Sequence, residues 1–143
     1  MRVLPLSLRS SLLFAVLVAL IAACSGSQVS AADDIDVREA LARQEAGGVL
    51  LDVRTVGEYQ VGHAVGAHLV PWVDGSGRMN PDFFAQVGTL ASPDQEVLVI
   101  CQSGNRSVPA ARALRERGYH AAVNVLGGSM AWHRRGLPWE AGR

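Results

Sequence analysis

The sequence predicts an α/β domain in which a mostly parallel sheet carries helices on both faces. Short apolar runs with the composition of buried strands, such as Val97–Ile100, alternate along the chain with segments whose apolar residues recur at helical spacing. Alternation of this kind is typical of parallel sheets covered on both faces. With 143 residues, 49% of them hydrophobic, the chain has room for one domain with its own core.

The first half of the domain is expected to contribute a helix, two strands and a turn of helix. The helix covers residues 35–46; its inward residues are Val37, Ala40 and Leu41, and its candidate caps are Asp33, Asp34 and Asp36. After it come a buried strand over 49–53, a helical turn around Tyr59, a short strand over 67–70 and an exposed loop over 74–77.

The second half repeats the alternation. A helix is expected over 81–90, with Asn80 as its cap and Pro81 at its first position. The strand Val97–Ile100, a helix over 108–117 and a strand over 121–126 follow. Trp132, Trp139, Phe83 and Phe84 fit core and edge packing, because no basic residues are interleaved with them.

Cys101 is the candidate nucleophile because it stands at the carboxyl end of a buried strand, the edge at which α/β sheets bind ligands. A polar loop links it to the next helix: Gln102, Ser103, Gly104, Asn105 and Arg106. Unpaired amides, the helix dipole and an arginine favour an anion in such a loop and lower the pKa of a thiol. Gly104 supplies the positive φ that the loop needs. The alternative is that Cys101 is only a small buried apolar residue.

The loop has four residues between Cys101 and Arg106, whereas cysteine-dependent phosphatases have five. It resembles the active loop of the rhodanese (sulfurtransferase) family. Two further segments resemble that family's signatures. The first contains Leu51, Asp52, Val53, Arg54, Glu58, Tyr59, Gly62, His63, Gly66, Ala67 and Pro71, and the second contains Gly127, Gly128, Trp132, Gly136, Leu137 and Pro138. The resemblance covers about residues 34 to 140 and implies a rhodanese-like, five-stranded version of the fold with an additional short strand near Asp34.

The resemblance implies a sulfurtransferase of the thiosulfate:thiophile type. Cys101 would take a sulfane sulfur from thiosulfate or a related small anionic donor, hold it as a persulfide and pass it to a thiol or cyanide-like acceptor. The amides of residues 102–106 and the Arg106 guanidinium would bind the donor. Two alternatives remain open: a rhodanese-like module that binds a protein or senses oxidants without turnover, and a small phosphatase or arsenate reductase, which needs the longer loop.

Asp52 and Arg54 end the strand over 49–53 and are possible secondary site residues. Arg54 is either a second anion ligand or, in the reading we favour, a structural residue paired to Glu58 while Asp52 accepts loop N–H groups. No cofactor is implied. The spacing of His63, His68, His120 and His133 does not suit a metal site. The formal net charge is zero and all 13 basic residues are arginine, so the composition gives no excess of basic charge for nucleic acid.

The amino-terminal segment has the pattern of an export signal. Arginines precede an apolar run over residues 12–23 that is too short to span a bilayer. Residues 1–23 are therefore expected to be a signal peptide, 24–33 a flexible tether and 34–143 the rhodanese-like domain. Ile21, Ala22, Ala23 and Cys24 resemble a lipobox, which implies a lipid on Cys24 and a membrane-anchored protein of the periplasm or cell envelope.

Two alternatives concern the same segment. Ordinary signal peptidase has a rival cleavage site at Val29, Ser30 and Ala31. A disulfide from Cys24 to Cys101 is disfavoured because it would pin the tether across the active loop.

Overall fold

The computed structural model describes residues 34–141. The predicted signal peptide, the lipobox with Cys24 and the tether over 24–33 lie outside the described residues, and so do the last two residues of the domain. Among the helices of the described part, none combines the length and apolar character needed to cross a membrane.

A five-stranded sheet forms the centre of the domain, with strand order β1-β6-β5-β2-β4 and every neighbouring pair parallel. The strands are β1 Asp34–Ile35, β2 Val49–Asp52, β4 His68–Leu69, β5 Val97–Ile100 and β6 Ala122–Val125. The parallel sheet predicted from the alternation is confirmed, and so is the additional short strand near Asp34. Every residue of β5 and β6 is buried, as expected for central strands with helices on both faces.

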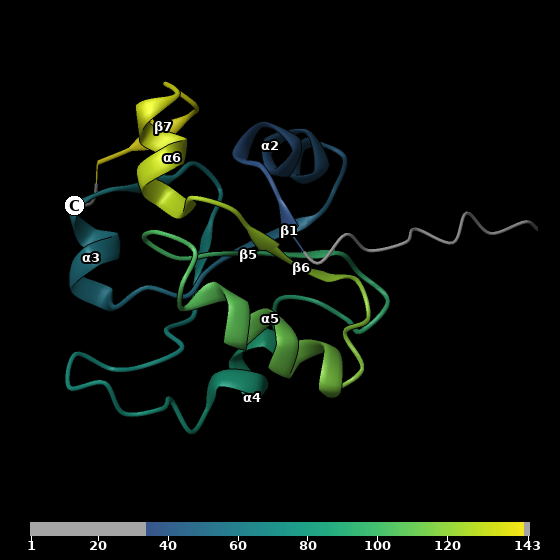
Figure 1. Ribbon diagram of the computed structural model, residues 1–143. Helices are drawn as coiled ribbons and strands as arrows, with labels where there is room; N and C mark the ends of the chain where they lie inside the picture. Colours follow the sequence, from purple (N-terminus) through teal and green to yellow (C-terminus); the bar gives the residue numbers. More distant parts are fainter. Residues whose placement is uncertain (1–33, 142–143) are drawn as a thin grey trace, which may run out of the picture. The chain divides into compact units, whose positions relative to one another are not determined.

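Helices cover both faces of the sheet. In Figure 1, α2 and α6 lie above the sheet while α4 and α5 lie below it. The helices are α2 Val37–Glu45, α3 Val56–Val61, α4 Phe83–Gly88, α5 Ser107–Glu116 and α6 Gly128–Arg134. A second, antiparallel pair of short strands, β3 His63–Ala64 and β7 Trp139–Glu140, lies outside the main sheet.

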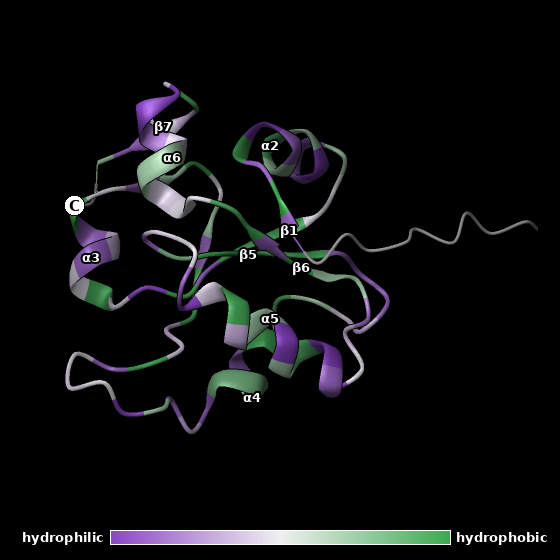
Figure 2. Ribbon diagram, in the orientation of Figure 1, coloured by the Kyte–Doolittle hydropathy of each residue, from purple (hydrophilic) through white to green (hydrophobic). Residues whose placement is uncertain are grey.

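Each face of the sheet has its own apolar core. Phe83 of α4 and Leu114 of α5 belong to one buried cluster, and Val37 of α2 and Trp132 of α6 belong to the other. Figure 2 shows β5, which runs between the two layers, as a continuous hydrophobic segment. The expected packing role of Trp132 and Phe83 is confirmed, since both side chains are fully buried.

The structure corrects two predicted helix starts. Ile35 belongs to strand β1, not to a helix, and α2 begins after Asp36, whose carboxylate accepts hydrogen bonds from the amides of Arg38 (2.7 Å) and Glu39 (3.0 Å). Pairing with β6 supplies Ile35 with a hydrogen-bonded neighbour that a local pattern does not reveal.

Helix α4 begins at Phe83 with Asp82 as its cap residue, not at Pro81 with Asn80 as cap. The Asn80 side chain instead accepts a hydrogen bond from the Asp82 amide (3.0 Å) and donates one to the Pro71 carbonyl (2.8 Å). These contacts hold Pro81 in a turn ahead of the helix.

Candidate active site

The carboxyl ends of the central strands bring the predicted site residues together. Cys101 directly follows β5, and its predecessor Ile100 is the register partner of Asp52 at the end of β2. The loop after β6 leads to Gly128, which approaches Cys101 and Gln102 closely. Three strands therefore deliver their following loops to one edge of the sheet.

The Cys101 sulfur is buried, with 1% of the residue exposed, and it accepts hydrogen bonds. The Gly104 amide donates to Sγ at 3.2 Å and the Ser107 hydroxyl donates to it at 3.3 Å. Burial raises the pKa of the Cys101 thiol, but the bonds from the Ser107 hydroxyl and from the amides of Ser107, Gly104 and Ser103 outweigh it, so the pKa is lowered from its usual 9.0. The site thus favours the nucleophilic thiolate.

Helix α6 holds the first peptides of the loop in place. The Ser129 amide donates to the Cys101 carbonyl (2.7 Å) and the Met130 amide donates to the Gln102 carbonyl (3.1 Å). No peptide bond in the described residues is cis, so the amides on the other side of these two peptides, those of Gln102 and Ser103, point away from α6. This orientation leaves them available to the sulfur and to an anion bound beside it.

Two glycines permit this arrangement. Gly104 has φ +104°, so the positive φ predicted for the loop is confirmed. Gly128 has φ +58°, and a Cβ there would lie 2.3 Å from the Cys101 carbonyl oxygen. A side chain at either position would strain or displace the loop.

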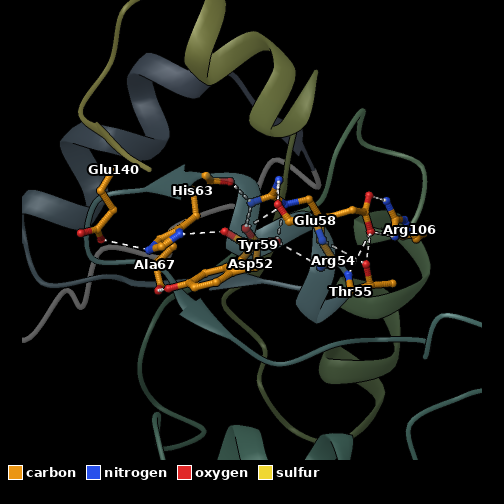
Figure 3. A network of polar contacts seen from close by, with 10 residues as sticks. Asp52, Arg54, Thr55, Glu58, Tyr59, His63, Ala67, Arg106 and Glu140 are labelled. Carbon is orange, nitrogen blue, oxygen red and sulfur yellow. Dashed lines mark hydrogen bonds and ion pairs between the residues drawn. The ribbon is translucent and has the colours of Figure 1, made fainter. Parts of the chain in front are cut away.

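Arg106 faces a carboxylate. Its guanidinium donates two hydrogen bonds to Glu58 of α3, Nη1 to Oε2 at 2.7 Å and Nη2 to Oε1 at 2.5 Å (Figure 3). Glu58 also accepts from the Thr55 amide (3.0 Å) and hydroxyl (2.8 Å), which completes the capping box of α3. The hydrogen bonds from Arg106, foremost, and from Thr55 outweigh burial and lower the pKa of Glu58 from 4.5 to about 2.

Asp52 and Arg54 form a buried ion pair, 1% and 5% exposed. Arg54 Nη2 lies 2.6 Å from Asp52 Oδ2, and Nε donates to the same carboxylate at 2.9 Å. Asp52 also accepts from the Arg54 amide (3.0 Å), as the structural reading expected.

The predicted partner of Arg54 is wrong. Arg54 does not pair with the carboxylate of Glu58; it reaches that residue only at the carbonyl (3.3 Å), and it also donates to the carbonyl of Gly62 (2.9 Å). Arg54 therefore ties the end of β2 to the first turn of α3 and to its C-cap residue, Gly62.

His63 joins the same network and fixes the turn after α3. Its ring stacks on Tyr59 with centroids 3.6 Å apart, and its Nδ1 donates to the Tyr59 carbonyl at 3.0 Å. Its Nε2 lies 3.0 Å from Glu140 of β7, and the Tyr59 hydroxyl donates to the Ala67 carbonyl at 2.6 Å (Figure 3). Within residues 34–141, no group of three or more His, Cys, Asp or Glu side chains is placed to hold a metal ion.

The sequence did not predict the roles of two residues of the site. Ser107 lies just ahead of the helix predicted over 108–117, and its role depends on the loop folding back so that its hydroxyl meets Sγ. Glu58 was expected to pair with Arg54 and not with Arg106; the spacing Thr55 to Glu58 is that of a capping box, which locates its backbone but not its partner 48 residues away.

The structure is therefore an α/β domain in which a buried cysteine follows a parallel strand and accepts hydrogen bonds from the loop after it. The chain belongs to the rhodanese-like domain family, whose model matches residues 36–135.

Comparisons with individual proteins agree with this membership. The chain is 41% identical over 99 residues to thiosulfate sulfurtransferase 16, chloroplastic, of Arabidopsis thaliana, covering 67% of this chain and 82% of that protein. It is 32% identical over 108 residues to thiosulfate sulfurtransferase GlpE of Vibrio cholerae, covering 76% and 92%. The crystal structure of Rv0390 from M. tuberculosis superposes with a TM-score of 0.67 at 30% identity, covering 76% of this chain and 97% of that one.

Proposed function

We propose that this protein is a sulfurtransferase that moves a sulfane sulfur from thiosulfate or a related donor to a thiophilic acceptor through a persulfide on Cys101. Membership of the rhodanese-like family and the relatives named thiosulfate sulfurtransferase support the transferase class. The observation that carries the proposal is the hydrogen-bonded Cys101 sulfur with its lowered pKa.

The first step is attack of the Cys101 thiolate on the outer sulfur of the donor. With thiosulfate, the new bond joins Sγ to that sulfur, the sulfur–sulfur bond of the donor breaks, and its electron pair leaves with sulfite. The products are a persulfide anion with one negative charge and a sulfite dianion, so charge and atoms balance. The hydrogen bonds that lower the pKa of the thiol would stabilise the persulfide anion, because it places negative charge in the same loop.

The second step returns the enzyme to its starting state. A thiol or cyanide-like acceptor attacks the outer sulfur of the persulfide, and the Cys101 thiolate leaves.

The amides of Gln102 and Ser103, which point away from α6, are the groups we assign to the bound donor and to the anion that departs in the first step. Gly104, Asn105 and Arg106 complete the loop, with Arg106 held by Glu58.

Steady-state turnover with thiosulfate and cyanide tests the proposal. The wild-type protein is expected to form thiocyanate, and a folded Cys101→Ser protein is expected to form none, because the described domain contains no other thiol to carry the sulfur. Equal turnover in both proteins would contradict it. A folded wild-type protein without turnover on any sulfane donor would favour a binding or sensing module.

We also propose that the protein is exported to the periplasm or cell envelope and anchored by a lipid on Cys24, on the sequence pattern around residues 21–24. The full chain is then expected in the membrane fraction, labelled by fatty acid, and Cys24→Ala is expected to lose both properties. A wild-type protein that is unlabelled and begins at Ala32 would show that the ordinary cleavage site is used.

A further inference from the structure

Two arginines at the carboxyl edge of the sheet, Arg54 and Arg106, are each paired with a carboxylate. Arg54 pairs with Asp52, and Arg106 pairs with Glu58. Two carboxylates therefore offset the charges of these two guanidinium groups, and a thiolate on Cys101 would add a negative charge to the loop. A donor that approaches this loop meets oriented backbone amides, while the guanidinium groups of Arg54 and Arg106 are already paired.

Glu58 is held firmly as the charged partner. Its two oxygens accept four hydrogen bonds within 3.0 Å, two from Arg106 and two from Thr55. The carboxylate is only partly exposed, with 28% of its side chain in contact with solvent, so water screens its charge incompletely. Because Thr55 belongs to the cap of α3, the position of Glu58 is fixed by its own helix as well as by Arg106.

Resting on the proposed sulfur transfer, we propose that Glu58 determines donor specificity by neutralising Arg106, so that the site disfavours dianionic donors such as thiosulfate relative to sulfane donors with one negative charge. Glu58 acts through Arg106 and is a positioning residue, not a catalytic one. The repulsion that a fixed negative charge exerts on a donor is proportional to the donor's charge, so the penalty for a dianion is twice that for a monoanion in the same place.

Thiosulfate and methanethiosulfonate form a matched pair of donors for this question. Both offer a terminal sulfur bonded to a second, oxidised sulfur, but in methanethiosulfonate a methyl group replaces one charged oxygen. Attack by the Cys101 thiolate on the terminal sulfur gives the same persulfide anion in both cases. The leaving group is dianionic sulfite from thiosulfate and monoanionic methanesulfinate from methanethiosulfonate, so both reactions balance.

The experiment compares the full-length wild type with Glu58→Gln on both donors across a range of salt. For Glu58→Gln, kcat/KM for thiosulfate is expected to rise about tenfold at low ionic strength, mainly through a lower KM, and to return toward the wild-type value as salt is added. For methanethiosulfonate, with half the charge, the expected rise is only about threefold. Glutamine is the other residue that completes a capping box after Thr, so α3 keeps its cap.

Two variants separate charge from geometry. Glu58→Asp keeps the charge while it shortens the side chain, so it is expected not to gain in thiosulfate use. Glu116→Gln removes an equal charge near the far end of α5, from a carboxylate paired with Arg112 at 3.1 Å, and is expected to leave both donors unchanged.

Each outcome bears on the proposal. A folded Glu58→Gln protein with an unchanged ratio of kcat/KM values for the two donors, or one that loses activity equally on both, overturns the role of Glu58 and leaves the sulfurtransferase function standing. If neither the wild type nor any variant transfers sulfur from either donor, the proposed function itself fails, and the inference fails with it.

Discussion

Removal of the Ser107 hydroxyl is expected to make Cys101 less reactive without changing the fold. The hydroxyl lies 3.3 Å from Sγ and 3.2 Å from the Gly104 carbonyl, and it has one hydrogen to donate. When Sγ is a thiolate, the Ser107 hydroxyl is expected to donate its hydrogen bond to Sγ. When Sγ is a protonated thiol, the hydroxyl can donate to the Gly104 carbonyl instead. The Ser107→Ala variant therefore loses a bond that matters most to the charged state.

The size of the effect follows from this competition. A hydrogen bond to a charged group contributes about 1.5–3 kcal/mol, and the alternative bond to the carbonyl offsets part of that, leaving about 1 kcal/mol between the two states. This corresponds to a thiolate population about fivefold lower at any pH well below the pKa of the thiol. The amides of Gly104 and Ser103 still stabilise the thiolate, so reactivity is reduced and not abolished.

The assay is the rate of alkylation by iodoacetamide as a function of pH. For Ser107→Ala the rate is expected to be about fivefold below wild type at low pH and to approach the wild-type rate at high pH, where both sulfurs are ionised. Ser103→Ala is the matched control, since it removes an exposed hydroxyl from the same loop and keeps the amide. Identical pH–rate curves for wild type and a folded Ser107→Ala protein would refute the assignment of the hydroxyl to the thiolate.

Three further predictions concern stability and are checked by urea or acid unfolding followed by circular dichroism. Gly128→Ala is expected to cost about 2 kcal/mol or more and to reduce sulfur transfer, whereas Gly47→Ala, at φ +106° with open space around it, is expected to cost less; equal losses would contradict the close approach to Cys101. Asp52→Ala is expected to cost about 3–5 kcal/mol because it leaves the Arg54 guanidinium buried without its carboxylate, and a near-normal midpoint would argue against that buried pair. The folded-state pKa of Glu58, about 2, lies below its usual 4.5. The contribution of Glu58 to stability is therefore fully present above about pH 4.5 and is lost as the pH falls through 2. Glu58→Gln is expected to flatten the acid-unfolding curve between these pH values, and an unchanged curve would count against the ion pair.

The strands that could be predicted are those that carry their own local signal. The bounds of β5, Val97–Ile100, agree with the prediction. Four consecutive apolar residues, mostly β-branched, are typical of a strand buried between two layers of helices. Strands β3 and β7 have two residues each, too few for any periodicity, and depend on pairing with one another. The start of α2 was misplaced for the same reason, since Ile35 is a strand residue only because β6 lies beside it.

The features of the site likewise fall into two groups: positions that follow from the local sequence and side-chain contacts that do not. The positions of Cys101 and Gly104 follow from the strand, loop and helix order, so the sequence sufficed for them. The partner of Arg106 did not follow, because Glu58 is 48 residues away and reaches the guanidinium only after α3 packs beside the loop. Side-chain pairing between distant elements depends on the folded geometry, and a single sequence gives the two residue types without their distance.

The most direct test of the central claim is the intact mass of the full-length protein after brief incubation with thiosulfate and removal of the excess. The wild type is expected to gain the mass of one sulfur atom, to lose it when cyanide is added, and to show neither change as Cys101→Ser. An unchanged wild-type mass, or an equal gain in Cys101→Ser, would contradict a persulfide on Cys101 and with it the sulfur transfer proposed here.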